Sequence, residues 1–137
     1  MSESLTHMNL VNLIYQKIIK LVPQNEIRLI EKDVPENREH SYSVKGFIPD
    51  VYFWNEQLLI IGEAKTVKDF STSHSRKQIL AYLDECDIFD GISYFILAVP
   101  WQLRITAQNF FIRMKQDKSL KINKIIILDE LGGSFEI

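Results

Sequence analysis

Two long apolar runs, separated by a stretch with helical spacing, limit most strongly how this chain can fold. Residues Gln57–Lys65 are apolar almost throughout, and Ile92–Val99 form a continuous apolar run. Such runs are typical of strands that are buried on both faces of a sheet. Between them, Ser75–Phe89 has the spacing of a helix, with an inner stripe of Ile79, Leu83 and Cys86. A strand–helix–strand order predicts that the two strands are parallel.

The remaining segments add helices and strands on either side of this unit. Leu5–Val22 has helical spacing, and Pro23 ends the pattern. The positions that recur at this spacing are Leu5, Met8, Val11 or Asn12, Tyr15, Ile18 or Ile19, and Val22. The other expected elements are strands at Ile27–Glu31, Tyr42–Trp54 and Ile125–Leu128, a helix at Leu103–Lys115, and turns at Glu36–Glu39 and Asn55–Gln57.

The order of these elements predicts an α/β fold with a mixed central β-sheet and helices on both faces. The order is helix, three strands, helix and strand, followed by a C-terminal helix and strand. The hairpin end should be antiparallel and the two crossovers parallel. A length of 137 residues and 46% hydrophobic residues fit a single domain spanning residues 1–137.

Composition and charge exclude several classes of protein. Cys86 is the only cysteine, which rules out a disulfide scaffold and fits a reducing compartment. The longest apolar run is about half of a membrane span, and the first residues do not resemble a secretory signal. We therefore expect a cytoplasmic protein that does not enter membranes. The net charge of −2 argues against tight non-specific binding to nucleic acid, although Arg104–Lys124 is basic and Asp84–Asp90 is acidic.

Three charged residues near the ends of two neighbouring strands are the candidate site. Asp50 lies in the second expected strand, and Glu63 and Lys65 lie near the end of the third. Side chains alternate along a strand, so Glu63 and Lys65 project from one face. If the strands pair through the Asn55 turn, Asp50 comes level with Glu63. Two close carboxylates repel each other unless a cation lies between them, which predicts a Mg²⁺ or Mn²⁺ site with the Ala64 carbonyl as a further ligand.

The spacing of these residues resembles the signature of the PD-(D/E)XK nuclease superfamily. Pro49-Asp50 is followed, after twelve residues, by Glu63-Ala64-Lys65. Gln78 and Tyr82 form a Gln-x-x-x-Tyr pair on the next helix, which is similar to the motif of RecB-like members. The resemblance implies a restriction-endonuclease-like core, cleavage of DNA with a divalent cation, and roles for the matching residues. Asp50 and Glu63 would hold the cation, Lys65 would serve catalysis, and Gln78 and Tyr82 would position the substrate.

One departure from the superfamily concerns the first helix, where many members carry an acidic residue. Here the helix offers Asn9, Asn12 and Gln16, and Glu26 from the following loop is the expected substitute. His74 and Arg76, at the start of the Gln78 helix, are candidate phosphate contacts or ordinary solvated residues. His7 and His40 have no partner at metal-binding spacing.

Three functions are compatible with these observations. The first is a metal-dependent endonuclease of restriction, repair or junction-resolving type, which would need a homodimer or a recruiting partner to cut both DNA strands. The second is a nuclease-fold DNA-binding module that cuts weakly or not at all, which the missing helix acid favours. The third is an α/β interaction protein in which the motif is coincidental, and it predicts that Asp50 and Glu63 lie far apart.

Overall fold

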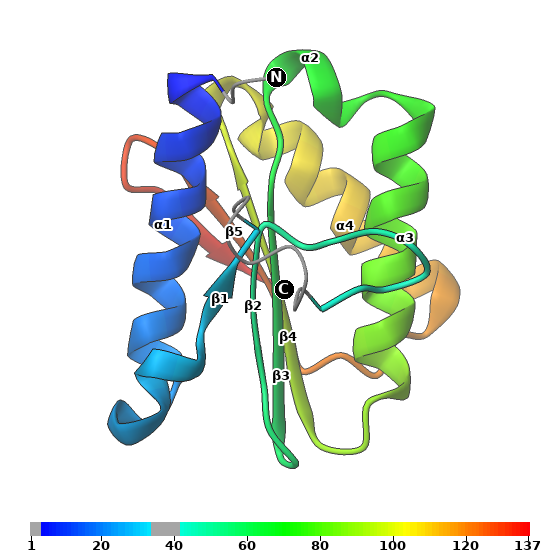
Figure 1. The fold of residues 1–137 in the computed structure, drawn as a ribbon. Helices are drawn as coiled ribbons and strands as arrows, with labels where there is room; N and C mark the ends of the chain where they lie inside the picture. Colours follow the sequence, from blue (N-terminus) through cyan, green and yellow to red (C-terminus); the bar gives the residue numbers. More distant parts are fainter. Residues whose placement is uncertain (1–3, 34–41) are drawn as a thin grey trace.

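A mixed sheet of six strands, in the order β1-β2-β3-β4-β5-β6, forms the centre of the fold (Figure 1). The computed structural model describes residues 4–33 and 42–137. The β2–β3 hairpin is antiparallel, and β3, β4 and β5 are parallel, as the sequence predicted. The strands are β1 (Glu31–Lys32), β2 (Val51–Trp54), β3 (Leu58–Ala64), β4 (Ile92–Val99), β5 (Lys124–Asp129) and β6 (Ser134–Glu136).

Helices cover both faces of this sheet, which confirms the predicted architecture (Figure 1). One face carries α1, and the other carries α3 and α4. Short helices complete the chain. The helical bounds are α1 (Leu5–Leu21), η1 (Gln24–Leu29), α2 (Val67–Phe70), α3 (Ser73–Ile88), η3 (Trp101–Leu103) and α4 (Arg104–Lys118).

Alternate residues of the central strands feed two separate cores. Ile60, Ile96 and Ile126 point to the α1 face, whereas Ile61, Phe95 and Ile127 point to the face of α3 and α4. All six side chains are fully buried. Burial on both faces explains why these strands are apolar almost without interruption.

Helix α1 buries only part of the expected set of side chains. Ile18 is buried as expected, whereas Leu5 and Met8 are 73% and 53% exposed, and Leu10 and Ile14 are buried in their place. The helix carries apolar residues on several sides, so the periodicity predicted the helix but displaced its inner face in the first turns. Gly62 of β3 allows the close approach of this helix, because a Cβ there would overlap the Ile14 side chain.

Two predicted strands are wrong or too long. The segment expected as Ile27–Glu31 begins as the 3-10 helix η1, in which the Glu26 N–H donates to the Pro23 carbonyl, and only β1 follows. The segment Tyr42–Trp54 joins the sheet only from Val51. Lys45 and Gly46 have φ values of 51° and 86° and form a tight turn between Val44 and Phe47. The turn expected at Glu36–Glu39 lies outside the described residues.

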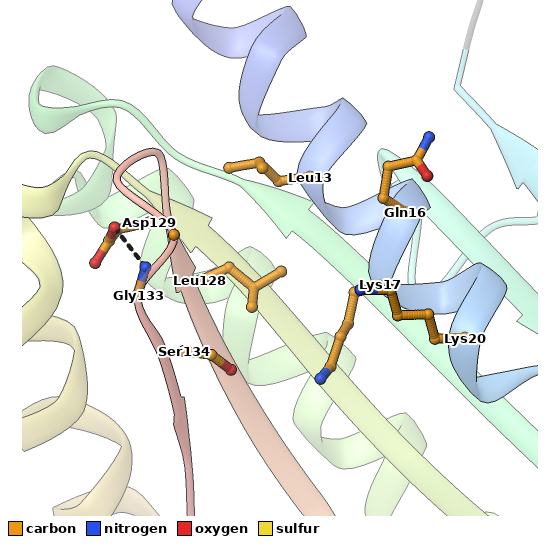
Figure 2. Close-up of a pocket in the computed structure, with 9 residues that line it drawn as sticks. Leu13, Gln16, Lys17, Lys20, Leu128, Asp129, Gly133 and Ser134 are labelled. Carbon is orange, nitrogen blue, oxygen red and sulfur yellow. Dashed lines mark hydrogen bonds between the residues drawn. The ribbon is translucent and has the colours of Figure 1, made fainter.

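Strand β6 was not predicted, and it returns through a turn that Asp129 organises. The Asp129 carboxylate accepts hydrogen bonds from the backbone N–H groups of Leu131 and Gly133 at 2.8 and 3.0 Å. Between this turn and α1 lies a hollow of about 240 Å³, shown in Figure 2. Lys17 and Lys20 of α1 line its other side.

None of the helices within the described residues combines the length and the apolar character that crossing a bilayer requires.

Candidate functional site

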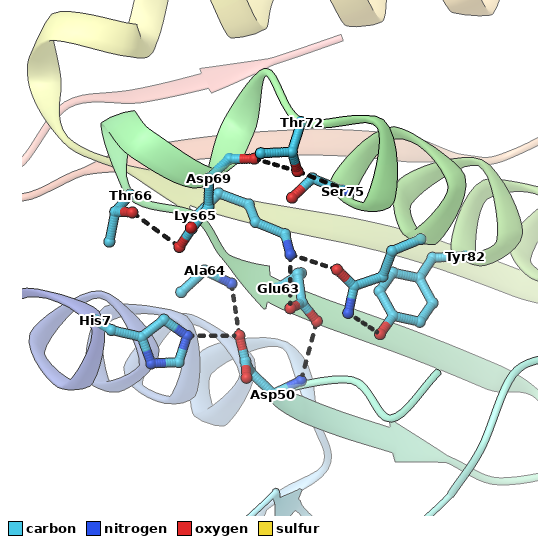
Figure 3. A network of polar contacts seen from close by, with 11 residues as sticks. His7, Asp50, Glu63, Ala64, Lys65, Thr66, Asp69, Thr72, Ser75 and Tyr82 are labelled. Atoms are coloured by element: carbon cyan, nitrogen blue, oxygen red, sulfur yellow. Dashed lines mark hydrogen bonds and ion pairs between the residues drawn. The ribbon is translucent and has the colours of Figure 1, made fainter. Parts of the chain in front are cut away.

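The predicted charged residues meet at the carboxyl end of β3, between the first turns of α1 and α3 (Figure 3). Val51 pairs with Gly62, so Asp50, which directly precedes β2, lies opposite Glu63. The Asp50 N–H donates to Glu63 Oε1 at 3.3 Å. The wide separation expected for a coincidental motif is therefore not observed.

The Asp50 carboxylate is held by groups from two segments of the chain, the end of β3 and the first turn of α1. Its Oδ2 accepts the Ala64 N–H at 2.9 Å and lies 3.2 Å from His7 Nε2. Asp50 itself is only 8% exposed. The structure thus gives the Ala64 backbone a role in orienting this carboxylate, whereas its carbonyl was the predicted ligand.

Lys65 lies on the same face of β3 as Glu63, as the alternation of strand side chains predicted. Its Nζ is 3.6 Å from Glu63 Oε2 and donates to Gln78 Oε1. The Gln78 amide in turn donates to the Tyr82 hydroxyl at 3.1 Å. Gln78 and Tyr82 therefore form a chain of hydrogen bonds that holds the ammonium group, and the hydroxyl of Tyr82 is within the protein interior.

The buried carboxyl groups of this cluster oppose one another's ionisation and therefore lower the stability of the fold. Burial, followed by the charge of Asp50, raises the pKa of Glu63 well above its ordinary value, and the Lys65 ammonium offsets only part of this effect. Burial also raises the pKa of Tyr82, with further contributions from Glu63 and Asp50. When both carboxylates are ionised, their charge exceeds that of the single ammonium, and an added cation would neutralise the excess.

The donor set suits a hard divalent cation. Mg²⁺ usually binds one or two carboxylates and keeps several of its waters. Asp50 and Glu63 provide such a pair. Within residues 4–33 and 42–137, no three His, Cys, Asp or Glu side chains form a metal-binding group by themselves. A cation at this point would therefore complete its coordination with water, backbone oxygen or substrate oxygen.

His7 is the residue that the sequence interpretation missed. It occupies the first turn of α1, where the Ser4 hydroxyl accepts its backbone N–H at 3.1 Å. His7 lies one turn before Leu10 on the buried face of the helix. A correct choice of that face would have indicated that His7 extends an apolar stripe toward the site.

The other predicted site residues have their principal contacts outside this cluster. Glu26 accepts a hydrogen bond from the Asn55 side chain at 3.2 Å, at the β2–β3 turn and thus at the opposite end of β3, so it does not substitute for the missing acid. His74 is exposed, and its ring meets the edge of Phe47 with centroids 5.5 Å apart. The Arg76 guanidinium lies over the Phe70 and Phe110 rings.

No protein-family model matches this sequence, and neither a curated protein nor a solved structure matches the chain. The resemblance to PD-(D/E)XK nucleases therefore stays a prediction from the sequence motifs.

Proposed function

We propose that this protein is a divalent-metal-dependent nuclease that hydrolyses DNA phosphodiester bonds, and that it acts as an endonuclease of restriction, repair or junction-resolving type. The observation that carries the proposal is the buried contact of Lys65 with Glu63 and Gln78, next to Asp50, at one strand end. A cluster of this kind costs folding free energy, because buried charges lose their hydration. A requirement for catalysis explains why such a cluster is present.

Each residue has a distinct task in this mechanism. Asp50 and Glu63 would hold Mg²⁺ or Mn²⁺, which polarises a phosphoryl group and lowers the pKa of a bound water. The Lys65 ammonium orients the attacking water and stabilises the negative charge that develops on the phosphoryl oxygens. The water oxygen forms a bond to phosphorus as the bond to the leaving oxygen breaks; the attacking water releases one proton to solvent, and the leaving oxygen takes one up from solvent. Gln78 and Tyr82 keep Lys65 in position rather than contacting the substrate directly.

The cellular setting follows from the same proposal. A single catalytic cluster cuts one strand at a time, so cleavage of a duplex requires a second copy of the chain or a recruiting partner. The buried single thiol of Cys86 suits the reducing cytoplasm. Sedimentation with and without duplex DNA would reveal whether two copies assemble on the substrate.

A second candidate is a nuclease-fold DNA-binding module with little or no activity. The contact of His7 with Asp50 favours it, because His7 occupies the place at which an acid of the first helix would approach the carboxylates. Mg²⁺ or Mn²⁺ titration by calorimetry separates the two candidates, since only the nuclease needs a cation at this cluster. Absence of binding at millimolar metal would favour the binding module.

The decisive test is a cleavage assay with a matched pair of lysine variants. Wild type, Lys65→Met and Lys68→Met would be incubated with plasmid, linear duplex, single-stranded and four-way-junction DNA in Mg²⁺, Mn²⁺ or EDTA. Lys68 is three residues from Lys65 but exposed, so its variant controls for charge. We expect metal-dependent cleavage that only Lys65→Met removes. Failure to cut any substrate, or equal cutting by the Lys65 variant, would contradict the proposal.

A further inference from the structure

A second polar cavity lies away from the carboxylate cluster, between the start of α3 and the first half of α4. It measures about 280 Å³ and is lined by Arg76, Thr106, Asn109, Phe110 and Arg113. In the sequence, the basic residues near Arg76 and those of the last helix form two separate clusters. The fold brings them together, because α3 and α4 pack side by side on the same face of the sheet (Figure 1).

Arg76 is fixed in this cavity by aromatic rings. Its guanidinium carbon is 4.6 Å from the centroid of the Phe70 ring and 4.2 Å from that of Phe110. The two rings meet edge to face at an angle of 82°, so they form a corner that holds the cation. An arginine already ordered in this way loses less side-chain entropy when it binds an anion.

The partners of Arg76 and Arg113 in the cavity are donors rather than acids. Thr106, Asn109 and Arg113 lie on one face of α4, at positions i, i+3 and i+7. The lining contains no carboxylate. In the part of the chain that the structure describes, no ion pair involves either arginine. Burial lowers the pKa of Arg76, which indicates a cation that is partly stripped of water without a compensating acid.

The hollow beside α1 is a weaker candidate for the same ligand. Its cations are Lys17 and Lys20 of α1 (Figure 2). Lysine side chains are flexible point charges, whereas arginine presents a planar set of donors that matches the oxygens of a phosphate.

We propose that the cavity between Arg76 and Arg113 binds a phosphate group of the nucleic-acid backbone, and so forms an anchoring site separate from the carboxylate cluster. This inference rests on the proposed function for its choice of nucleic acid. Arg76 and Gln78 are two residues apart on α3, so they project about 200° apart around the helix. Gln78 therefore contacts Lys65 while Arg76 faces α4, and the bound phosphate belongs to a nucleotide other than the one that is cut.

The test compares Arg113→Gln with Lys20→Gln. Both residues are exposed and each variant removes one positive charge, but Lys20 lies on the opposite face of the sheet. Binding to a short duplex would be measured in EDTA, without cleavage, over a range of salt concentrations. We expect Arg113→Gln to weaken binding on the order of tenfold at low salt and to reduce the slope of log K against log salt by about one, with Lys20→Gln close to wild type. Equal effects of the two variants, or none for Arg113→Gln, would overturn the proposal.

A titration with inorganic phosphate, monitored by NMR, tests whether the cavity binds phosphate in the absence of DNA. We expect saturable shifts of the Asn109 side-chain amide and the Arg76 Nε–H signal, which Arg113→Gln weakens. Shifts confined to Lys17 and Lys20 would overturn the proposal. Cleavage by the wild type is recorded in parallel. If it cuts DNA while Arg113→Gln binds DNA normally, the anchoring site fails and the nuclease stands. If it does not cut while phosphate still binds this cavity, the nuclease fails and the anion site stands.

Discussion

Buried polar groups occur at both ends of the parallel strands, and the two ends use them differently. At the amino end of β4, Ser93 is 1% exposed and neutral. Its hydroxyl donates to the Cys86 carbonyl at 2.8 Å, and its N–H donates to the Asn123 side chain at 2.9 Å. The Ser93 hydroxyl therefore satisfies a carbonyl in the last turn of α3, which the helix itself leaves without a partner. The hydrogen bonds of Ser93 therefore stabilise the fold at this end of the sheet.

The carboxyl end of β3 has the opposite character. Asp50, Glu63 and Lys65 are all less than 10% exposed, and the pKa of Glu63 is raised because burial and Asp50 both oppose its ionisation. Neutral residues of similar size would pack there at lower cost. The contrast teaches that hydrogen bonding alone does not distinguish the two ends. They differ in charge, because the end of β3 buries two carboxyl groups beside a single ammonium group, and this difference supports the proposed function.

The largest expected effect is on cleavage when one carboxylate loses its charge. Asp50→Asn removes a ligand of the proposed cation and should reduce the cleavage rate on the order of a thousandfold, since metal-based stabilisation contributes several kcal/mol. The free energy of unfolding should stay equal or rise, because repulsion of Glu63 is relieved. Cleavage kinetics and urea unfolding measure the two effects.

Asp84, which is about half-exposed and paired with Lys45 at 3.2 Å, provides the matched control for this experiment. Asp84→Asn should leave cleavage unchanged. If Asp50→Asn kept wild-type activity or unfolded the protein, the carboxyl end of β3 would not serve cleavage at the expense of stability.

A smaller loss is expected when the support of Lys65 is removed. Gln78→Leu keeps the volume but deletes the acceptor of the ammonium group, and should slow cleavage roughly 10- to 100-fold. Tyr82→Phe removes only the hydroxyl that accepts from the Gln78 amide at 3.1 Å, so its effect should be milder. Rates at saturating DNA, beside DNA affinity in EDTA, show which step changes. Loss of affinity with an unchanged rate would mean that Gln78 contacts substrate instead.

The sequence predicted the proximity of Asp50, Glu63 and Lys65 better than it predicted the edges of the fold. Asp50, Glu63 and Lys65 are related by strand alternation and by one short hairpin, and both follow local rules that need no knowledge of distant packing. The first two strands at the edge were misjudged because backbone geometry ended them early. Positive φ values at Lys45 and Gly46, and a 3-10 turn after Pro23, are not visible in hydrophobic periodicity.

His7 and Arg76 show a second limit of sequence interpretation. The place of His7 depends on which side of α1 meets the sheet, and that helix is apolar on several sides. The place of Arg76 depends on Phe110, which is 34 residues away in the sequence. Contacts between separate helices are decided by tertiary packing, so the start of α3 indicated an anion site without indicating its partner helix.

At the amino end of β4, a substitution should lower the stability of the protein and leave cleavage unchanged. Ser93→Ala removes the hydrogen bond to the Cys86 carbonyl and leaves that buried acceptor without a partner. We expect a loss of about 1–2 kcal/mol in the free energy of unfolding, with no change in the cleavage rate per folded molecule. Urea denaturation and cleavage assays on the same preparation measure both quantities. A Ser93 variant that folds normally but cuts poorly would show that the two ends are coupled.

The smallest expected effect is a pH dependence of stability that originates from Cys86 at the same end. Burial raises the pKa of its thiol, with smaller contributions from Glu85 and Asp87. Above the ordinary pKa of a cysteine, the unfolded thiol ionises while the folded thiol remains protonated. The unfolded state then binds fewer protons, so the free energy of unfolding falls as the pH rises. Between about pH 8 and 9.5, this fall should amount to about 1 kcal/mol.

Unfolding curves of wild type and Cys86→Ala over this range test the assignment, because the variant should lose the dependence even if its stability is lower at every pH. A parallel decline in both proteins would place the titrating group elsewhere.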